Sequence, residues 1–319
     1  IGLFIAKTHD DFPYYHLPNA LHFSENKLEF GLGNLNHGFK QPSSIFYLYS
    51  LFNLPFIKFY AFNFINFLFL VFAVFYFSEN LIKQIKLNKF DQDEILKLIF
   101  LIVIITIFNR VGAYGTDITG QILSLILFFI FFELIKKDNL INLNVENILI
   151  FISILSFLIT IKTYFVIYGI LPIAIFYFFN NKILLLKKIL CSRVFVFSIV
   201  VIFMMVVTNI ISTGCIIYPI SSLCYPNFFF WGLDIDTVQY LSNWYEIWSK
   251  AGAGPDFREI EPEKYIEGFN WLNSWIDRYF FNKVSDFLLS IFLCVIIFSI
   301  IFRNCFKIRK FQKRSKISL

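Results

Sequence analysis

Seven apolar segments constrain this chain more than any other feature of its sequence. Each is low in charge, and most approach the roughly 20 apolar residues that one helical crossing of a bilayer needs. They are the ranges 58–77, 94–109, 118–135, 145–161, 163–179, 190–211 and 284–302. Only 16% of the chain is charged, whereas a soluble domain averages about a quarter. We therefore predict an all-α membrane protein with about seven transmembrane helices.

The distribution of Lys and Arg predicts the orientation, because these residues gather in cytoplasmic loops. With seven spans, all the basic clusters fall on one side of the membrane. They lie at 83–89, 136–137, 182–188 and 303–316. We expect that side, and the C-terminus, in the cytoplasm. The net charge of +6 is concentrated in the tail, so it indicates orientation and predicts no nucleic-acid partner.

The same pattern divides the chain into four segments. We expect an outer loop with interfacial helices, a transmembrane core, a Trp-rich outer loop, and a last span with a basic tail. Their bounds are 1–57, 58–211, 212–283 and 284–319. The apolar stretch 42–56 is short for a span, so we interpret it as an interfacial helix. The first residues resemble the end of a preceding span, so we expect a fragment that lacks an N-terminal helix.

The polar stretch 9–44 contains all four histidines and the acid pair Asp10–Asp11. A carboxylate at the outer membrane surface can act as a general base on an acceptor hydroxyl. The alternative is that both acids are simply solvated. With His9 and His16 they could also hold a divalent metal, although closeness in sequence is weak evidence for one. The sequence predicts no other cofactor.

Four more ionisable residues lie at the outer ends of apolar segments. Ionisable groups there indicate function by default. Asp117 lies between two predicted spans with Arg110 close by, Lys162 separates two short apolar segments, and Lys40 precedes Pro42. The three cations are candidates for binding a lipid phosphate. Asp117 could instead be a helix-start acid favoured by the dipole, and Lys162 could extend to the surface.

All five tryptophans fall in the outer loop 212–283. Trp244 and Trp248 are four residues apart, as are Trp271 and Trp275, so on a helix each pair shares a face. Such faces suit helices that lie at the membrane interface. They also suit a platform on which sugar rings stack. The sequence leaves both interpretations open.

The cysteines divide by compartment. Cys215 and Cys224 both lie in the outer loop, where an oxidising environment permits a disulfide between them. We therefore predict that they are bonded and close a short loop. The spacing typical of a zinc site is absent.

Several short motifs resemble an uncharacterised family of bacterial multi-spanning proteins. They are YHL at 15–17, GLGNLNHGF at 31–39, SS at 43–44 and YP at 218–219. The order of an outer acid, a YH pair, a Lys-Pro-like KQP at 40–42 and a second outer acid also resembles the GT-C class of integral-membrane glycosyltransferases. KQP lacks the second proline of the Lys-Pro-Pro element in that class.

The GT-C resemblance implies roles for the candidate residues. Asp11, or else Asp10, would be the catalytic base and Asp117 the supporting acid. Lys162, Lys40 and Arg110 would bind the donor phosphate, with Tyr15 and His16 beside the substrate. The list of candidates is Asp10, Asp11, Tyr15, His16, Lys40, Arg110, Asp117 and Lys162.

The function expected from this resemblance is sugar transfer at the outer face of the bacterial inner membrane. A polyprenyl-phosphate-linked sugar would be the donor and a cell-envelope molecule the acceptor. The alternative is a non-enzymatic transporter or an assembly subunit of an envelope polysaccharide system. A transporter should place its ionisable groups near the middle of the membrane on broken helices.

Overall fold

The computed structural model describes most of the chain between residues 11 and 299. The described ranges are 11–79, 81–87, 92–107, 115–135, 145–179, 182–252, 259, 261–281, 284–285, 287–293, 295–296 and 299. Over these residues the chain is all-helical, as predicted, and forms no strand. Its β-structure is limited to isolated bridges, Leu54 with Lys58 and Cys215 with Cys224.

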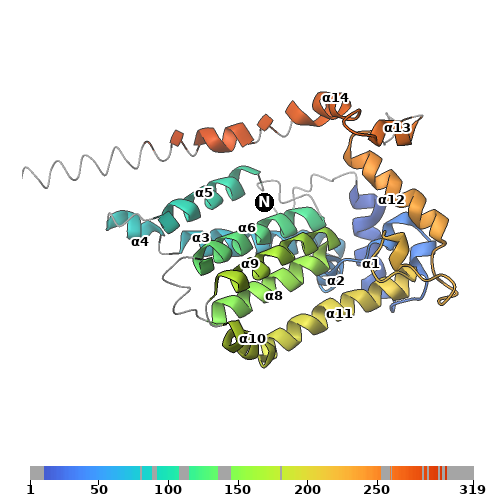
Figure 1. The fold of residues 1–319 in the computed structure, drawn as a ribbon, viewed down its shortest axis with the longest axis horizontal. Helices are drawn as coiled ribbons and strands as arrows, with labels where there is room; N and C mark the ends of the chain where they lie inside the picture. The colour runs from blue at the N-terminus through green and yellow to red at the C-terminus, as the bar shows by residue number, and fades with distance from the viewer. Residues whose placement is uncertain are drawn as a thin grey trace, which may run out of the picture. The chain divides into compact units, whose positions relative to one another are not determined.

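The helices are labelled in chain order in Figure 1. The α-helices are α1 Leu17–Glu25, α2 Ser44–Ser50, α3 Asn63–Ser78, α4 Leu81–Lys86, α5 Gln92–Ile107, α6 Thr116–Ile135, α8 Val145–Ile161, α9 Ile170–Phe178, α10 Lys182–Leu190, α11 Arg193–Thr213, α12 Ile235–Ser249, α13 Pro262–Ile266 and α14 Leu272–Trp275. Short 3₁₀ segments are η2 Leu32–Asn34, η3 His37–Lys40, η4 Phe59–Ala61, η5 Thr163–Gly169 and η6 Ser221–Leu223. The π-helical turns are η1 Phe12–His16 and η7 Ile276–Phe280.

The chain forms two compact units. One comprises residues 1–71 and 110–249, and the other residues 72–109 and 250–319. The division differs in kind from the four predicted segments, since each unit joins stretches that are far apart in sequence. In the second unit, α4 packs on α5, and Phe77 contacts Phe100 with ring centroids 5.5 Å apart.

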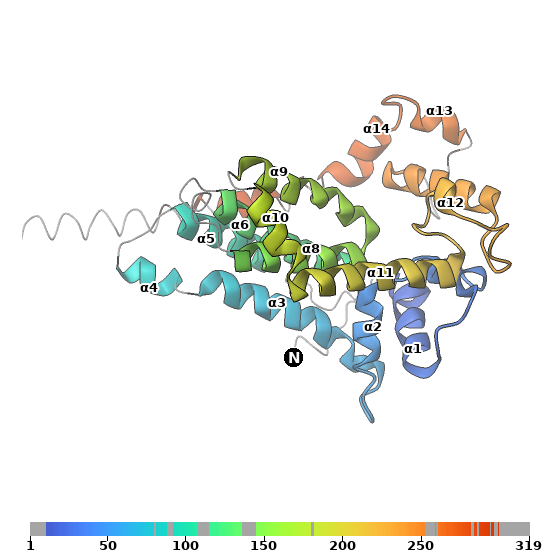
Figure 2. The same ribbon diagram turned by 60° about the horizontal axis from the view of Figure 1, so that its bottom comes forward.

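The first unit is built around α8, which packs against both α6 and α11 (Figures 1 and 2). Beside these helices, α1 packs on α2, and α2 also contacts α8. Ile45, Phe46 and Tyr49 of α2 are fully buried. The stretch 42–56, expected as an interfacial helix, is therefore a shorter helix whose apolar face is covered by protein, followed by turns.

Local sequence explains where the central helices begin and end. The Ser43 hydroxyl accepts a hydrogen bond from the Ile45 amide and caps α2. α8 ends at Ile161, where Lys162 adopts an extended backbone conformation before η5. α11 ends at Thr213 and is capped by Gly214, whose φ of 74° suits glycine at a helix C-terminus. The predicted break at Lys162 is thus confirmed.

Three helices of the described residues are long and apolar enough to cross a membrane. They are Phe59–Ser78, Thr116–Ile135 and Arg193–Thr213. Val145–Ile161 and Thr163–Phe178 are shorter apolar helices, and α5 is also short, with 16 residues. The predicted last span, 284–302, lies partly outside the described residues. The count of seven spans therefore stays a prediction.

Candidate functional site

An ion pair joins two of the predicted site residues, Asp117 and Lys162. Lys162 Nζ lies 2.6 Å from Asp117 Oδ1, although the residues are 45 positions apart in the chain. Asp117 lies in the first turn of α6, where the helix dipole favours an acid. The Lys162 ammonium also lies 5.5 Å from the centre of the Tyr164 ring. The side chains of Asp117 and Lys162 are 57% and 31% exposed, so both are open to a ligand.

The SS motif fixes the position of Lys162. The Ser43 hydroxyl donates to the Ile161 carbonyl at 2.6 Å, immediately before Lys162. The Thr160 hydroxyl donates to the Ser44 hydroxyl at 3.0 Å. Both contacts tie the start of α2 to the last turn of α8. The two serines therefore hold the helix end that carries the lysine.

A buried polar network fixes the position of Asp117. The Tyr49 hydroxyl donates to Asn66 Oδ1 at 2.7 Å and accepts from the Gly115 amide at 3.3 Å. The Thr119 hydroxyl donates to the same Asn66 oxygen at 2.8 Å. These contacts hold the backbone just before α6 and its first turn. We call the Asp117–Lys162 pair and the groups that hold it the ion-pair corner.

Tyr15 and His16, from η1, adjoin the ion-pair corner. Burial raises the pKa of Tyr15 well above its usual range, and the negative charges of Asp11 and Asp117 raise it further. The Tyr15 hydroxyl therefore stays protonated. His16 is 4% exposed, and a Cβ at Gly115 would lie 2.9 Å from its Cε1 atom. Gly115 thus lets the His16 ring pack against the backbone before α6.

The other predicted site residues are placed differently. Lys40, in η3, packs its aliphatic stem over Gly33, and burial lowers the pKa of its ammonium group. Its charge acts on His37, whose pKa is lowered mainly by burial and also by Lys40. Asp10 and Arg110 lie outside the described residues. Of the predicted residues, Asp117 and Lys162 are thus in direct contact, Tyr15 lies within the electrostatic influence of Asp11 and Asp117, and His16 packs beside Gly115.

No group of three or more His, Cys, Asp or Glu that could hold a metal ion occurs among the described residues. The metal site considered from the sequence included His9 and Asp10, which are outside that part of the chain.

The GLGNLNHGF motif connects η1 to the end of α11. The Gly31 amide donates to the Ile211 carbonyl at 2.8 Å, and the Ser212 hydroxyl donates to the Phe39 carbonyl at 2.8 Å. Gly38 packs against Tyr15, where a Cβ would clash with the tyrosine. The Asn19 side chain donates to the carbonyls of both Tyr15 and Gly38. The motif therefore contacts both η1 and the end of α11.

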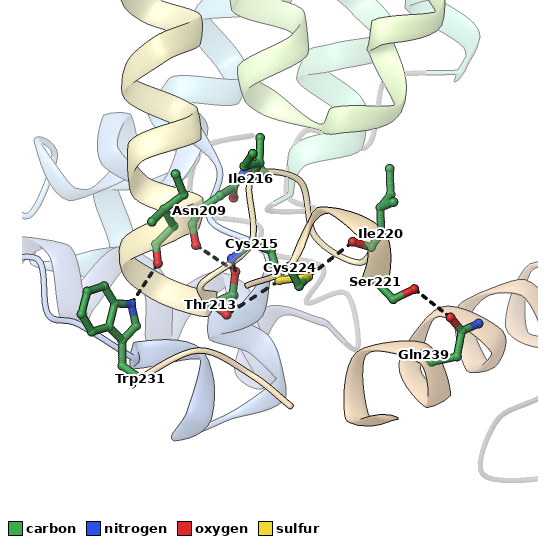
Figure 3. The surroundings of a disulfide bond; sticks show 10 residues. Asn209, Thr213, Cys215, Ile216, Ile220, Ser221, Cys224, Trp231 and Gln239 are labelled. Carbon is green, nitrogen blue, oxygen red and sulfur yellow. Dashed lines mark hydrogen bonds between the residues drawn. A yellow bond between two sulfur atoms is a disulfide. The ribbon is translucent and has the colours of Figure 1, made fainter. Parts of the chain in front are cut away.

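The disulfide predicted between Cys215 and Cys224 is present (Figure 3). Their Cα atoms are 3.9 Å apart, and the two residues form an antiparallel bridge. The bond lies in a segment, 214–233, that we call the disulfide loop. The Ser221 hydroxyl donates to Gln239 Oε1 at 2.8 Å and joins this loop to α12, as Figure 3 shows.

Trp244 and Trp248 both lie on α12 and share one face of it, as predicted. Other aromatic side chains lie close to them. The rings of Trp244 and Trp248 stack with centroids 5.2 Å apart. The Tyr245 hydroxyl lies 2.8 Å from His37 Nε2. Burial raises the pKa of Tyr245 to about 12, so this hydroxyl stays protonated. Trp271 and Trp275 of the other predicted pair lie edge to face, 6.4 Å apart.

Sequence reasoning missed the residues that hold the ion pair. In the sequence, Tyr49, Asn66 and Thr119 stand out only as parts of apolar segments. Asn63 and Asn66, polar residues at helical spacing within such a segment, were the available signal, because a buried amide requires hydrogen-bond partners.

A family model described as a domain of unknown function, DUF8201, matches residues 5–318. No curated protein and no solved structure matches the chain.

Proposed function

The chain belongs to the DUF8201 family, and we propose that it is a membrane glycosyltransferase with a polyprenyl-phosphate-linked sugar as donor. The acceptor is a hydroxyl of a cell-envelope molecule at the outer face of the bacterial inner membrane. The single observation that carries the proposal is the partly exposed Asp117–Lys162 pair beside Tyr15. It brings a cation at the end of α8 into contact with a carboxylate in the first turn of α6.

Lys162 is suited to the donor phosphate. An ammonium group has three N–H donors, and one of them is directed at Asp117 Oδ1. The others can bind the phosphate oxygens that carry the negative charge as the sugar leaves. Positive charge held in place where negative charge develops lowers the barrier of transfer. Asp117 is then the group that orients the ammonium.

Asp11 is the proposed base. An acceptor oxygen attacks the anomeric carbon, and the bond from that carbon to the phosphate oxygen breaks, leaving its electron pair on the phosphate. The acceptor proton passes to the Asp11 carboxylate and then to water. The products are a glycoside and polyprenyl phosphate. The effect of Asp11 on the Tyr15 pKa supports its place next to the ion-pair corner.

The proposed topology has seven spans, a GT-C-like arrangement and a cytoplasmic C-terminus. α11 supports a lipid-facing role, because it exposes large apolar side chains such as Phe197 and Phe203 over much of its length. A helix that is apolar on all sides and still exposed is suited to lipid. The basic cluster that includes Lys187 and Lys188 precedes α11, as a cytoplasmic end requires.

The test is transfer of labelled sugar from polyprenyl-phosphate-linked hexoses in membranes that contain the intact protein. Asp11→Asn keeps the size of the side chain but removes proton acceptance, so transfer should fall about 10²–10⁴-fold. Asp10→Asn should reduce transfer by a smaller factor than Asp11→Asn. Asp277→Asn, an exposed acid of the second unit, is the matched control and should keep full transfer.

Protein abundance in each membrane preparation must be equal for the comparison to hold. Full transfer by Asp11→Asn, Asp10→Asn and the double variant would remove the enzymatic proposal. The ion-pair corner would then belong to a transporter or an assembly subunit.

A further inference from the structure

Five side chains form a continuous row of rings that starts at the ion-pair corner. In order, they are Tyr15, Tyr14, His37, Trp244 and Trp248, and we call them the aromatic track. Successive ring centroids are 6.4, 6.2, 5.9 and 5.2 Å apart. The row runs from η1 across η3 to α12. It therefore joins elements that are more than 200 residues apart in the chain.

The two ends of the aromatic track differ in their surroundings. Tyr15, at the inner end, is buried enough to raise its pKa and lies within the influence of Asp11 and Asp117. Tyr14 is 52% exposed and Trp248, at the outer end, is 41% exposed. The track thus leads from the solvent-exposed surface of α12 to the proposed reaction centre.

The orientation of Trp244 argues against a simple membrane anchor. An anchoring tryptophan directs its ring away from the protein toward the lipid headgroups. The half-buried Trp244 ring instead meets the His37 ring of η3 edge to face, with centroids 5.9 Å apart. Polar groups lie along the row, since His37 Nε2 pairs with the Tyr245 hydroxyl. Rings mixed with hydrogen-bonding groups are typical of a ligand site.

Sugar rings fit this combination of groups. A pyranose with equatorial hydroxyls presents axial C–H bonds on its faces and hydroxyls around its edge. The C–H hydrogens carry partial positive charge, and the face of an aromatic ring carries partial negative charge. The edge hydroxyls can meet polar side chains such as His37 and Tyr245. β-Linked hexopyranoses keep such faces along the whole chain.

We propose that the aromatic track binds the acceptor, which is a β-linked glycan chain. Successive sugars of this chain lie against successive rings of the track, and the growing end of the chain lies at the ion-pair corner. This inference rests on the proposed function and deepens it. The substrate class is an oligosaccharide of several units rather than a monosaccharide.

The test measures binding by the full chain in detergent without any transfer. Cello-oligosaccharides of two to six units, with glucose as the monomer, are titrated and followed by tryptophan fluorescence. Affinity should increase with chain length over the first units, and glucose should bind most weakly. Trp248→Ala should weaken binding of cellohexaose about tenfold, whereas Trp248→Phe should retain most of it.

The matched control is Phe230→Ala. Phe230 is an aromatic side chain of the same unit, 95% exposed and outside the aromatic track. Its loss should leave cellohexaose binding unchanged. Because Trp248 and Phe230 are both exposed, neither replacement removes a core side chain.

The outcomes separate the two proposals. Absence of length-dependent binding, or equal affinity of Trp248→Ala and the natural chain, overturns the glycan track even if sugar transfer is found. Length-dependent binding that needs Trp248 supports the track, even if Asp11→Asn leaves transfer unchanged.

Discussion

The ion-pair corner and the disulfide loop both fix a segment at the end of a long apolar helix, by different means. At the corner, buried hydrogen bonds from Tyr49 and Thr119 to Asn66 hold the start of α6. In the disulfide loop, a covalent bond and backbone contacts hold the segment after α11. The Tyr225 amide, for example, donates to the Gly214 carbonyl at 3.1 Å.

Because the two regions are held in different ways, their loss should affect stability and ligand binding differently. Side-chain hydrogen bonds at the corner hold the two helix ends that carry the charged groups, so a change in these bonds should move the ion pair. The disulfide restrains the unfolded chain. The disulfide loop contacts α11, α12 and Asn34 of η2, and none of these elements carries Asp117 or Lys162. We therefore expect damage at the corner to affect both stability and ligand binding, and damage at the disulfide to affect stability alone.

Asn66→Ala should have the largest effect on stability. It leaves the buried hydroxyls of Tyr49 and Thr119 without their shared acceptor, and each loss costs about 1–3 kcal/mol. Thermal unfolding in detergent measures the change. The matched control is Asn243→Ala on α12, an exposed amide whose removal should cost less than about 0.5 kcal/mol. Equal unfolding temperatures for the two variants would refute the role of the network.

The double variant Cys215→Ser, Cys224→Ser should lower the free energy of unfolding by about 2–3 kcal/mol, from loop-closure entropy. Its affinity for polyprenyl phosphate should equal that of the natural chain, because the bond lies outside the ion-pair corner. Reduction of the natural chain with a thiol should reproduce the shift in unfolding temperature. Lost affinity in the double variant would break the comparison between the two regions.

Ser43→Ala should cost about 1 kcal/mol, from the loss of a helix cap and of the bond to Ile161. It should also weaken the binding of polyprenyl phosphate at Lys162, because Ser43 holds the helix end that precedes this lysine. Ser192→Ala is the matched control, because Ser192 caps α11 through the Val194 amide. Both variants should lose the stability that a cap provides, with Ser43→Ala losing more because of the bond to Ile161, and only Ser43→Ala should lose affinity for polyprenyl phosphate. Equal affinities of Ser43→Ala and Ser192→Ala for polyprenyl phosphate would show that Ser43 contributes to stability and not to binding at Lys162.

The smallest effect concerns pH. The folded protein holds the pKa of His37 below its value in the unfolded chain, by burial and by the charge of Lys40. The contribution of His37 to stability is therefore complete above about pH 6.5. It is lost as the pH falls toward the lower folded value, because the unfolded chain binds the proton first. Unfolding temperatures should fall less between pH 7.5 and 5.5 in His37→Gln, and an identical fall would contradict this.

The sequence predicts the helical class, the break at Lys162 and the disulfide, because each depends on local composition or spacing. It also identifies Asp117 and Lys162 individually as charged residues at the ends of apolar segments. Their pairing could not be predicted, because it depends on how α6 packs against α8. Tyr49 and Asn66 were missed for the same reason. Their hydrogen bonds reach partners that only the folded chain brings together.

The motifs illustrate the same limit. YHL, GLGNLNHGF and SS are visible in the sequence as motifs, but the sequence does not show which segments they contact. In the structure, all three motifs make contacts that hold neighbouring helical segments together. Gly38 admits Tyr15, Ser43 holds the end of α8, and the Gly31 amide bonds to α11. A pattern of small and polar residues marks such close contacts but does not say which helix each residue meets.

Binding of polyprenyl phosphate to the purified full chain tests the central claim most directly, because it requires neither the sugar nor the acceptor. Lys162→Met should weaken this binding about tenfold or more, since a charged hydrogen bond is worth about 1.5–3 kcal/mol. Lys162→Arg should retain most of it. Lys264→Met removes a lysine from an exposed ion pair with Glu261 and should change nothing. An unchanged affinity in Lys162→Met would contradict the assignment of the ion-pair corner as the phosphate site.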